Sequence, residues 1–202
     1  MGKIALSGRS NWEKDAGMLA SNAEQNLYEV FENAFKGTKY KLYRQPKHLK
    51  NLYATVEIPD SVKSVIYNPN IKLEDTKWGV SPDFAIENCE THKILFGEIK
   101  RQDGWVEGKN PSAGRGNANE RSCKLFTPGL IKAYRKVSNI TDERILPFWV
   151  VFQGDITRDP KRVREIMFWY DKYQDNYFMW RPGQSGEDLL KHFNEKLKPF
   201  LD

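Results

Sequence analysis

Two acidic residues and one lysine border apolar runs in the middle of the chain. Glu98 and Lys100 end the run LFGEIK, and Asp83 immediately precedes the run FAIE. Because side chains alternate along a strand, Glu98 and Lys100 would share one face. If the two runs pair as an antiparallel hairpin, the start of one strand lies beside the end of the other. Asp83 and Glu98 would then converge.

This group of side chains predicts a metal-dependent hydrolytic site. Two carboxylates close together repel each other unless a proton or a cation lies between them. Their hard oxygen atoms suit Mg²⁺, which retains water and binds through one or two carboxylates together with phosphate oxygens. A bound Mg²⁺ neutralises charge on a phosphate and acidifies water. We therefore predict Asp83 and Glu98 as metal ligands, and Lys100 as the group that orients the attacking water and holds the phosphate.

The same charges have a simpler interpretation. A Glu–Lys pair at the rim of a sheet contributes only about 0–1 kcal/mol and carries no chemistry. The pattern also has competitors within the chain, since Asp60 follows a second proline and Glu107 begins a second Glu-x-Lys. Asp83 and Glu98 are preferred because each borders an apolar strand, whereas Glu107 lies in a Gly-rich stretch.

The stretch GRGNANER, residues 114–121, carries side chains suited to reading DNA bases. Asn117 matches the adenine edge with two hydrogen bonds, and the small Ala118 allows the backbone to approach a base. Arg121 offers a fork to an adenine N7 or a phosphate, and Glu120 can accept from a base amino group. The structural alternative is a Gly/Asn loop that caps the following helix.

The order of these motifs resembles that of type II restriction endonucleases of the PD-(D/E)xK superfamily. The Pro-Asp…Glu-x-Lys pattern is followed by a segment similar to GNAIER of the EcoRI-like enzymes, with Asn119 as the departure. The matching positions are Gly116, Asn117, Ala118, Glu120 and Arg121. The similarity is concentrated between residues 80 and 125, and the whole chain is most similar to a member that cuts CAATTG.

The resemblance implies Mg²⁺-dependent hydrolysis of double-stranded DNA at a palindrome with an AATT centre. The cut would follow the first C and leave 5′-AATT overhangs with 5′-phosphates. The matching residues would read the centre, and Arg115, which precedes them, is predicted to read the outer C·G pair. A palindromic site favours a homodimer, and the family implies a cognate DNA methyltransferase in the same system.

Two other functions remain open from the sequence. One is a sequence-specific DNA-binding protein without cleavage, and the other is a less specific PD-(D/E)xK repair nuclease. Incubation with DNA and Mg²⁺ would separate them, because the first releases no product and the second cuts without a preferred hexamer.

Length and composition agree with a cytoplasmic DNA enzyme. The 202 residues fit a single catalytic and DNA-recognition domain over residues 1–202. A net charge of +5 and a pI near 9.0 mildly favour an anionic partner. Cys89 and Cys123 stand alone, which suggests neither a disulfide framework nor a zinc site. No signal-peptide core or membrane-spanning run is recognisable, so we expect no membrane contact.

Helical and strand-like patterns alternate along the chain, which predicts an α/β fold with a central mixed sheet flanked by helices. Helices are expected over residues 21–35, after Pro128, from Asp159–Pro160, and after Ser185; strands are expected at 84–87, 93–100, 146–154 and 177–180. Short strands or turns are expected between residues 56 and 80. Residues 36–56 contain six basic and no acidic side chains, and form either a solvated face or a phosphate-contacting surface.

Overall fold

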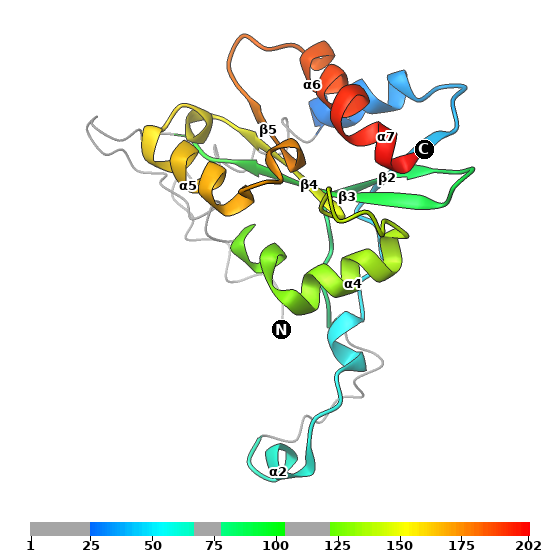
Figure 1. Ribbon diagram of the computed structural model, residues 1–202, viewed down its shortest axis with the longest axis vertical. Coiled ribbons are helices and arrows are strands. Elements are labelled where there is room, and N and C mark those ends of the chain that lie inside the picture. The colour runs from blue at the N-terminus through cyan, green and yellow to red at the C-terminus, as the bar shows by residue number, and fades with distance from the viewer. Residues whose placement is uncertain (1–24, 67–77, 104–121) are drawn as a thin grey trace, which may run out of the picture.

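The computed structural model describes residues 25–66, 78–103 and 122–202. A five-stranded sheet with the order β1-β2-β3-β4-β5 lies at its centre (Figure 1). The strands are β1 (Tyr40–Arg44), β2 (Phe84–Asn88), β3 (Lys93–Arg101), β4 (Phe148–Gln153) and β5 (Tyr177–Trp180). Neighbours among the first three are antiparallel, whereas β3, β4 and β5 run parallel, so the sheet is mixed.

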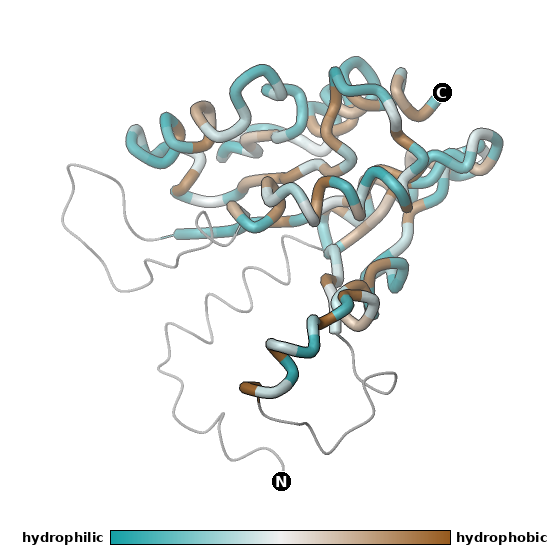
Figure 2. Tube along the Cα trace, turned by 60° about the horizontal axis from the view of Figure 1, so that its bottom comes forward, coloured by the Kyte–Doolittle hydropathy of each residue, from teal (hydrophilic) through white to brown (hydrophobic). Residues whose placement is uncertain are grey.

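Helices cover both faces of this sheet (Figure 1). One face packs against the helix at residues 25–34, α6 (Gly186–His192), the π-helical turn Phe193–Leu197 and α7 (Lys198–Leu201). The other face packs against α4 (Pro128–Ser138) and α5 (Pro160–Tyr170). In Figure 2 many of the hydrophilic segments lie in the loops that connect the strands and helices. The predicted α/β fold, with a central mixed sheet flanked by helices, is confirmed.

The alternation of side chains in the hairpin divides them between two hydrophobic cores. Phe84 and Leu95 point toward the helices at 25–34 and α6, whereas Ala85 and Phe96 point toward α4 and α5. Strand β4 is buried along its whole length, as a continuous apolar run predicts. Since Glu98 lies two residues beyond Phe96, it shares the face that α4 and α5 cover.

Local signals set the starts of the helices as the sequence predicts. Pro128 and Pro160 each occupy the first position of a helix, where the missing amide hydrogen has no cost. The carboxylate of Asp159 accepts hydrogen bonds from two amides of the first turn of α5. Ser185 and Asp188 form a capping box at the start of α6.

The structure also differs from the sequence-based expectations in three places. Strand β1 was not predicted, and the described part of residues 56–80, where short strands or turns were expected, contains the short helix α2 (Asp60–Lys63) followed by a turn. A 3₁₀ turn, η2 (Leu52–Thr55), precedes α2, which lies away from the sheet (Figure 1). The predicted last helix is interrupted by the π-helical turn, which separates α6 from α7.

Gly97 allows the two strands of the hairpin to pack around the ring of Phe84. A Cβ atom at position 97 would lie 2.0 Å from Cζ of Phe84, whose side chain is fully buried. We expect Gly97→Ala to lower the free energy of unfolding by about 1–3 kcal/mol, because the ring has no free space to enter. Urea denaturation measures this loss.

Gly129→Ala is the matched control, because a Cβ atom there meets nothing within 4 Å and lies in α4. It should leave stability unchanged or slightly raised. Equal unfolding midpoints for the two variants would contradict the packing argument.

Candidate active site

Asp83 and Glu98 lie opposite each other where the β2–β3 hairpin ends. Phe84 pairs with Gly97 in the antiparallel register, so the next pair outward joins Asp83 and Glu98. The backbone amide of Ile99 donates a 2.7 Å hydrogen bond to Oδ2 of Asp83. The side chain of Asp83 therefore reaches across to β3 beside Glu98.

The backbone of Asp83 is held by two other parts of the fold. Its carbonyl oxygen accepts a 2.8 Å hydrogen bond from the amide of Gln45, which directly follows β1. The same oxygen accepts a 3.0 Å hydrogen bond from the hydroxyl of Tyr28, in the helix at residues 25–34. The position of this carboxylate thus depends on the edge strand and on a helix of the opposite layer.

Glu98 is almost fully buried and forms an ion pair with Lys100. Its side chain is paired at 2.6 Å between Oε2 and Nζ of Lys100, and the residue is 6% exposed. Burial is the main cause that raises the pKa of Glu98, and the negative charge of Asp83 raises it further. The ammonium of Lys100 lowers this pKa without cancelling the effect of burial. The charged form of Glu98 would therefore gain from a further cation.

The donor atoms of this site fit a hard divalent cation. Asp83 and Glu98 offer carboxylate oxygens only, and no cluster of three or more His, Cys, Asp or Glu side chains able to hold a metal occurs in residues 25–66, 78–103 and 122–202. Two carboxylates suit Mg²⁺, since this ion keeps water ligands and adds substrate phosphate oxygens.

Lys124 is a neighbour of the site that the sequence did not reveal. It lies in the 3₁₀ turn η4 (Cys123–Phe126), which follows the stretch 114–121. Its positive charge lowers the pKa of Glu98, so the ammonium lies within electrostatic reach of that carboxylate. Nothing in its local sequence distinguishes Lys124 from other exposed lysines.

The remaining predicted site residues have different outcomes. The residues predicted to bind DNA, namely Arg115, Gly116, Asn117, Ala118, Glu120 and Arg121, lie outside the residues that the structure describes. Glu107, the competing Glu-x-Lys residue, also lies outside them. The competing Asp60 begins α2, where it forms an exposed 3.0 Å ion pair with Lys63 and takes no part in the hairpin.

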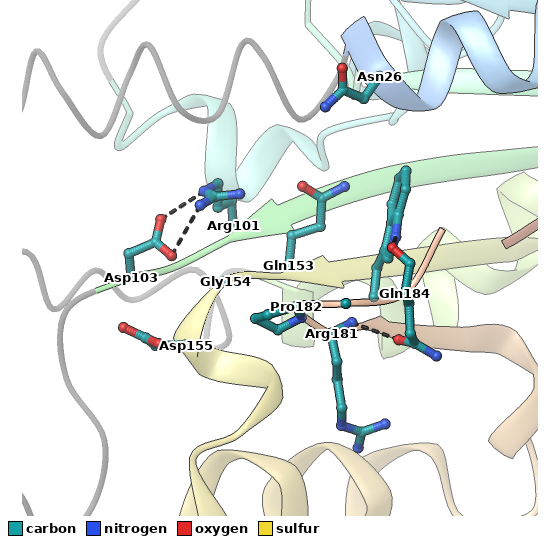
Figure 3. Close-up of a pocket in the computed structure, with 11 residues that line it drawn as sticks. Asn26, Arg101, Asp103, Gln153, Gly154, Asp155, Arg181, Pro182 and Gln184 are labelled. Atoms are coloured by element: carbon teal, nitrogen blue, oxygen red, sulfur yellow. Dashed lines mark hydrogen bonds and ion pairs between the residues drawn. The ribbon is translucent and has the colours of Figure 1, made fainter. Parts of the chain in front are cut away.

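A cleft of about 360 Å³, lined mostly by polar residues, lies at the ends of β3 and β4 (Figure 3). It lies on the face opposite Glu98, because Arg101 lines it and Arg101 is an odd number of residues from Glu98 along the strand. Arg101 points into it, since it alternates with Lys100 along β3. The guanidinium of Arg101 is paired with Asp103, at 2.7 Å between Nε and Oδ2. Gln153, the register partner of Arg101, also lines the cleft. This cleft is separate from the carboxylate pair.

The raised pKa of Glu98 predicts a pH-dependent cost to stability. Because the folded-state pKa exceeds the unfolded value, the folded protein binds this proton more tightly, and stability falls as pH rises through the interval between the two values. In the presence of a chelator that removes divalent ions, Glu98→Gln should therefore melt at a higher temperature than the native protein at neutral pH. The difference should disappear below the unfolded-state pKa. If the difference in melting temperature between the two proteins were the same at every pH, burial would not be what raises the pKa of Glu98.

Comparison with known proteins places the chain in a family. The family model described as "Type II restriction enzyme MunI" matches residues 1–202. A protein of that name from a Mycoplasma species is 75% identical over 202 residues and is covered completely, as is this chain. A crystal structure of MunI restriction endonuclease in complex with cognate DNA matches with a TM-score of 0.82 and 75% identity, covering 98% of this chain and 100% of that one.

The mixed sheet, the pair of carboxylates at the end of the β2–β3 hairpin and these matches together define a type II restriction endonuclease, a site-specific deoxyribonuclease. Within that class, the chain belongs to the MunI family. The resemblance inferred from sequence is confirmed, and membership implies dependence on a divalent metal ion. None of the helices in the described parts of the chain is both long and apolar enough to cross a lipid bilayer.

Proposed function

We propose that the chain cleaves double-stranded DNA at CAATTG after the first C, in a reaction that requires Mg²⁺. The observation that carries this proposal is the buried Glu98, paired with Lys100 and facing Asp83 in a chain of the MunI family. Support for the DNA substrate comes from the related crystal structure, which is a complex of MunI with cognate DNA. The AATT centre is supported by the segment GRGNANER.

Each of the three residues has a distinct role in this proposal. Asp83 and Glu98 hold Mg²⁺, which supplies positive charge to a phosphate and acidifies water when it is bound. Lys100 holds the scissile phosphate and orients the attacking water. The water oxygen forms a bond to phosphorus in line with the leaving O3′, and the bond between phosphorus and O3′ breaks. The products are a 3′-hydroxyl, which takes up a proton, and a 5′-phosphate.

Residues 114–121 read the bases in this proposal. Asn117 and Ala118 contact the AATT centre together with Gly116, Glu120 and Arg121, and Arg115 contacts the guanine of the outer pair. Arg115→Ala should reduce discrimination at that pair by about 1–3 kcal/mol. Cleavage rates on CAATTG and on variants of its outer pair measure this directly. An unchanged ratio of rates would contradict the assignment of Arg115.

The palindrome also determines the assembly that we propose. Residues 1–202 act as one domain, and two copies related by a two-fold axis place one active site on each DNA strand. The enzyme works in the cytoplasm beside a DNA methyltransferase that protects CAATTG in the host genome. Sedimentation with and without a CAATTG duplex tests the homodimer.

Cleavage of plasmid DNA in Mg²⁺, followed by sequencing of the ends, tests the function. We expect breaks at CAATTG only, with four-base 5′ overhangs. Breaks at another hexamer would overturn the proposed specificity, and breaks without a preferred sequence would indicate a less specific nuclease. Binding of CAATTG without product would overturn the proposed hydrolysis.

A further inference from the structure

The hydroxyl group of Tyr134 is buried and unpaired on the face of the sheet that carries Glu98. Tyr134 lies in α4 and is 0% exposed, and its hydroxyl has no hydrogen-bond partner within the part of the chain that the structure describes. A buried hydroxyl without a partner is unfavourable, so native proteins usually satisfy it with protein or ordered water.

The ring of Tyr134 packs on the pair of strand residues that precedes Glu98 and Val150 on the same face of the sheet. It makes edge contacts with Phe96 and Phe148, with centroids 5.2 Å and 5.9 Å apart. Phe96 and Phe148 are register partners on β3 and β4, and Glu98 with its partner Val150 follows two residues further on the same face.

Both carboxylates of the candidate site belong to the electrostatic surroundings of this hydroxyl. Burial is the main cause that raises the pKa of Tyr134 above its ordinary range, followed by Glu98, Tyr53 and Asp83 in that order. Since the ring packs on Phe96, two residues before Glu98 on the same face of β3, Tyr134 lies beside the candidate active site.

A second buried hydroxyl, on another helix, is also affected by the charge of Glu98. Tyr170 of α5 is fully buried, its hydroxyl also has no partner in the described residues, and the charge of Glu98 contributes to raising its pKa after burial and Tyr177. A site with several polar groups can hold an ordered water, which needs two to four partners. Tyr134 and Tyr170 thus supply two buried hydroxyls on the face of the sheet that carries Glu98.

We propose that Tyr134 is a positioning residue whose hydroxyl holds a water molecule against the carboxylate of Glu98, and so fixes the orientation in which Glu98 binds the metal ion. This inference rests on the proposed metal-binding role of Glu98. Partners of metal ligands orient those ligands, and their removal typically lowers metal affinity or activity by about 10-fold to 100-fold.

Tyr134→Phe tests the proposal, because it removes the hydroxyl and keeps the ring between Phe96 and Phe148. We expect the variant to fold with a stability close to that of the native enzyme, since the ring keeps its packing and a single water-mediated hydrogen bond has a small net effect. Its single-turnover cleavage rate at low Mg²⁺ should fall about 10-fold or more. The Mg²⁺ concentration that gives half of the maximal rate, here called the metal midpoint, should rise. Calorimetric titration with Ca²⁺ in the presence of uncleaved CAATTG duplex gives a readout that does not depend on cleavage.

Tyr40→Phe is the control, because the hydroxyl of Tyr40 bonds Asp202 in the opposite core, away from the site. It should lower stability and leave the metal midpoints unchanged. Equal metal midpoints for Tyr134→Phe and the native enzyme would overturn the proposal and leave Tyr134 as a core residue. If the native enzyme itself did not cleave in Mg²⁺, the proposed function would fail, whereas a shift in the Ca²⁺ midpoint would still support the role of Tyr134.

Discussion

Replacing Asp83 with alanine should abolish cleavage while DNA binding is retained or strengthened. Asp83 offers one of the two carboxylates that face each other at the end of the hairpin. A bound metal ion contributes several kcal/mol to such a reaction, so its loss corresponds to a rate at least about 10³-fold lower. Removal of a negative charge also reduces repulsion with DNA phosphates. Single-turnover cleavage and gel-shift binding measure the two effects separately.

Two companion variants make this experiment specific. Asp83→Asn keeps an oxygen that can accept from the amide of Ile99, so its loss of cleavage would report the charge and not the hydrogen bond. Asp60→Ala removes the other aspartate that follows a proline, and it should cleave normally because Asp60 is exposed in α2. Mg²⁺-dependent cleavage by Asp83→Ala at the native rate would refute the metal assignment.

Lys100→Met should lower the cleavage rate by about 10²-fold to 10³-fold, the range seen when one charge-stabilising group is removed. The ammonium of Lys100 is 2.6 Å from Oε2 of Glu98 and is one of two cations that lower the pKa of that residue. Without it, Glu98 retains its proton to a higher pH, and this proton competes with the metal ion for the carboxylate. The rate deficit should therefore narrow as the pH is raised, which pH profiles of single-turnover cleavage would reveal.

Lys93→Met serves as the control from the same strand. Lys93 lies at the opposite end of β3, where its ammonium donates to the backbone oxygen of Asp202 at 3.1 Å. We expect it to cleave at the native rate at every pH. If Lys93→Met and Lys100→Met behaved alike, the effect would reflect net charge on the strand and not the position of Lys100.

The hairpin and the burial of its strands could be predicted because their signals are local. Two apolar runs flank a short polar connection, and their lengths suit strands. The same runs set which residues share a face, and this placed Glu98 and Lys100 together. Strand β1 escaped prediction because YKLYR lies within a basic stretch, and its strand conformation comes from pairing with β2.

Other parts of the site depend on contacts between distant segments. Lys124 and Tyr134 approach Glu98 only because η4 and α4 pass over that face of β3. No periodicity or motif in the sequence encodes such a crossing.

The sequence also could not decide whether the basic stretch 36–56 is a solvated face or a surface that contacts phosphates. In the structure, Lys39 pairs with Asp202 at 2.9 Å and Arg44 pairs with Glu32 at 2.7 Å. These ion pairs reduce the positive charge that this segment can offer to phosphates.

Under the proposed function, the hydrogen bond from Ile99 to Asp83 would make catalysis depend on correct pairing of the two strands. It continues the ladder between β2 and β3 by one step, with a side chain in place of a carbonyl group. If the strands paired one residue out of step, every side chain of one strand would turn to the other face, and the acidic residues would part. A copy with this error would then lack the proposed active site, so it should not cut the chromosome of the cell that makes it.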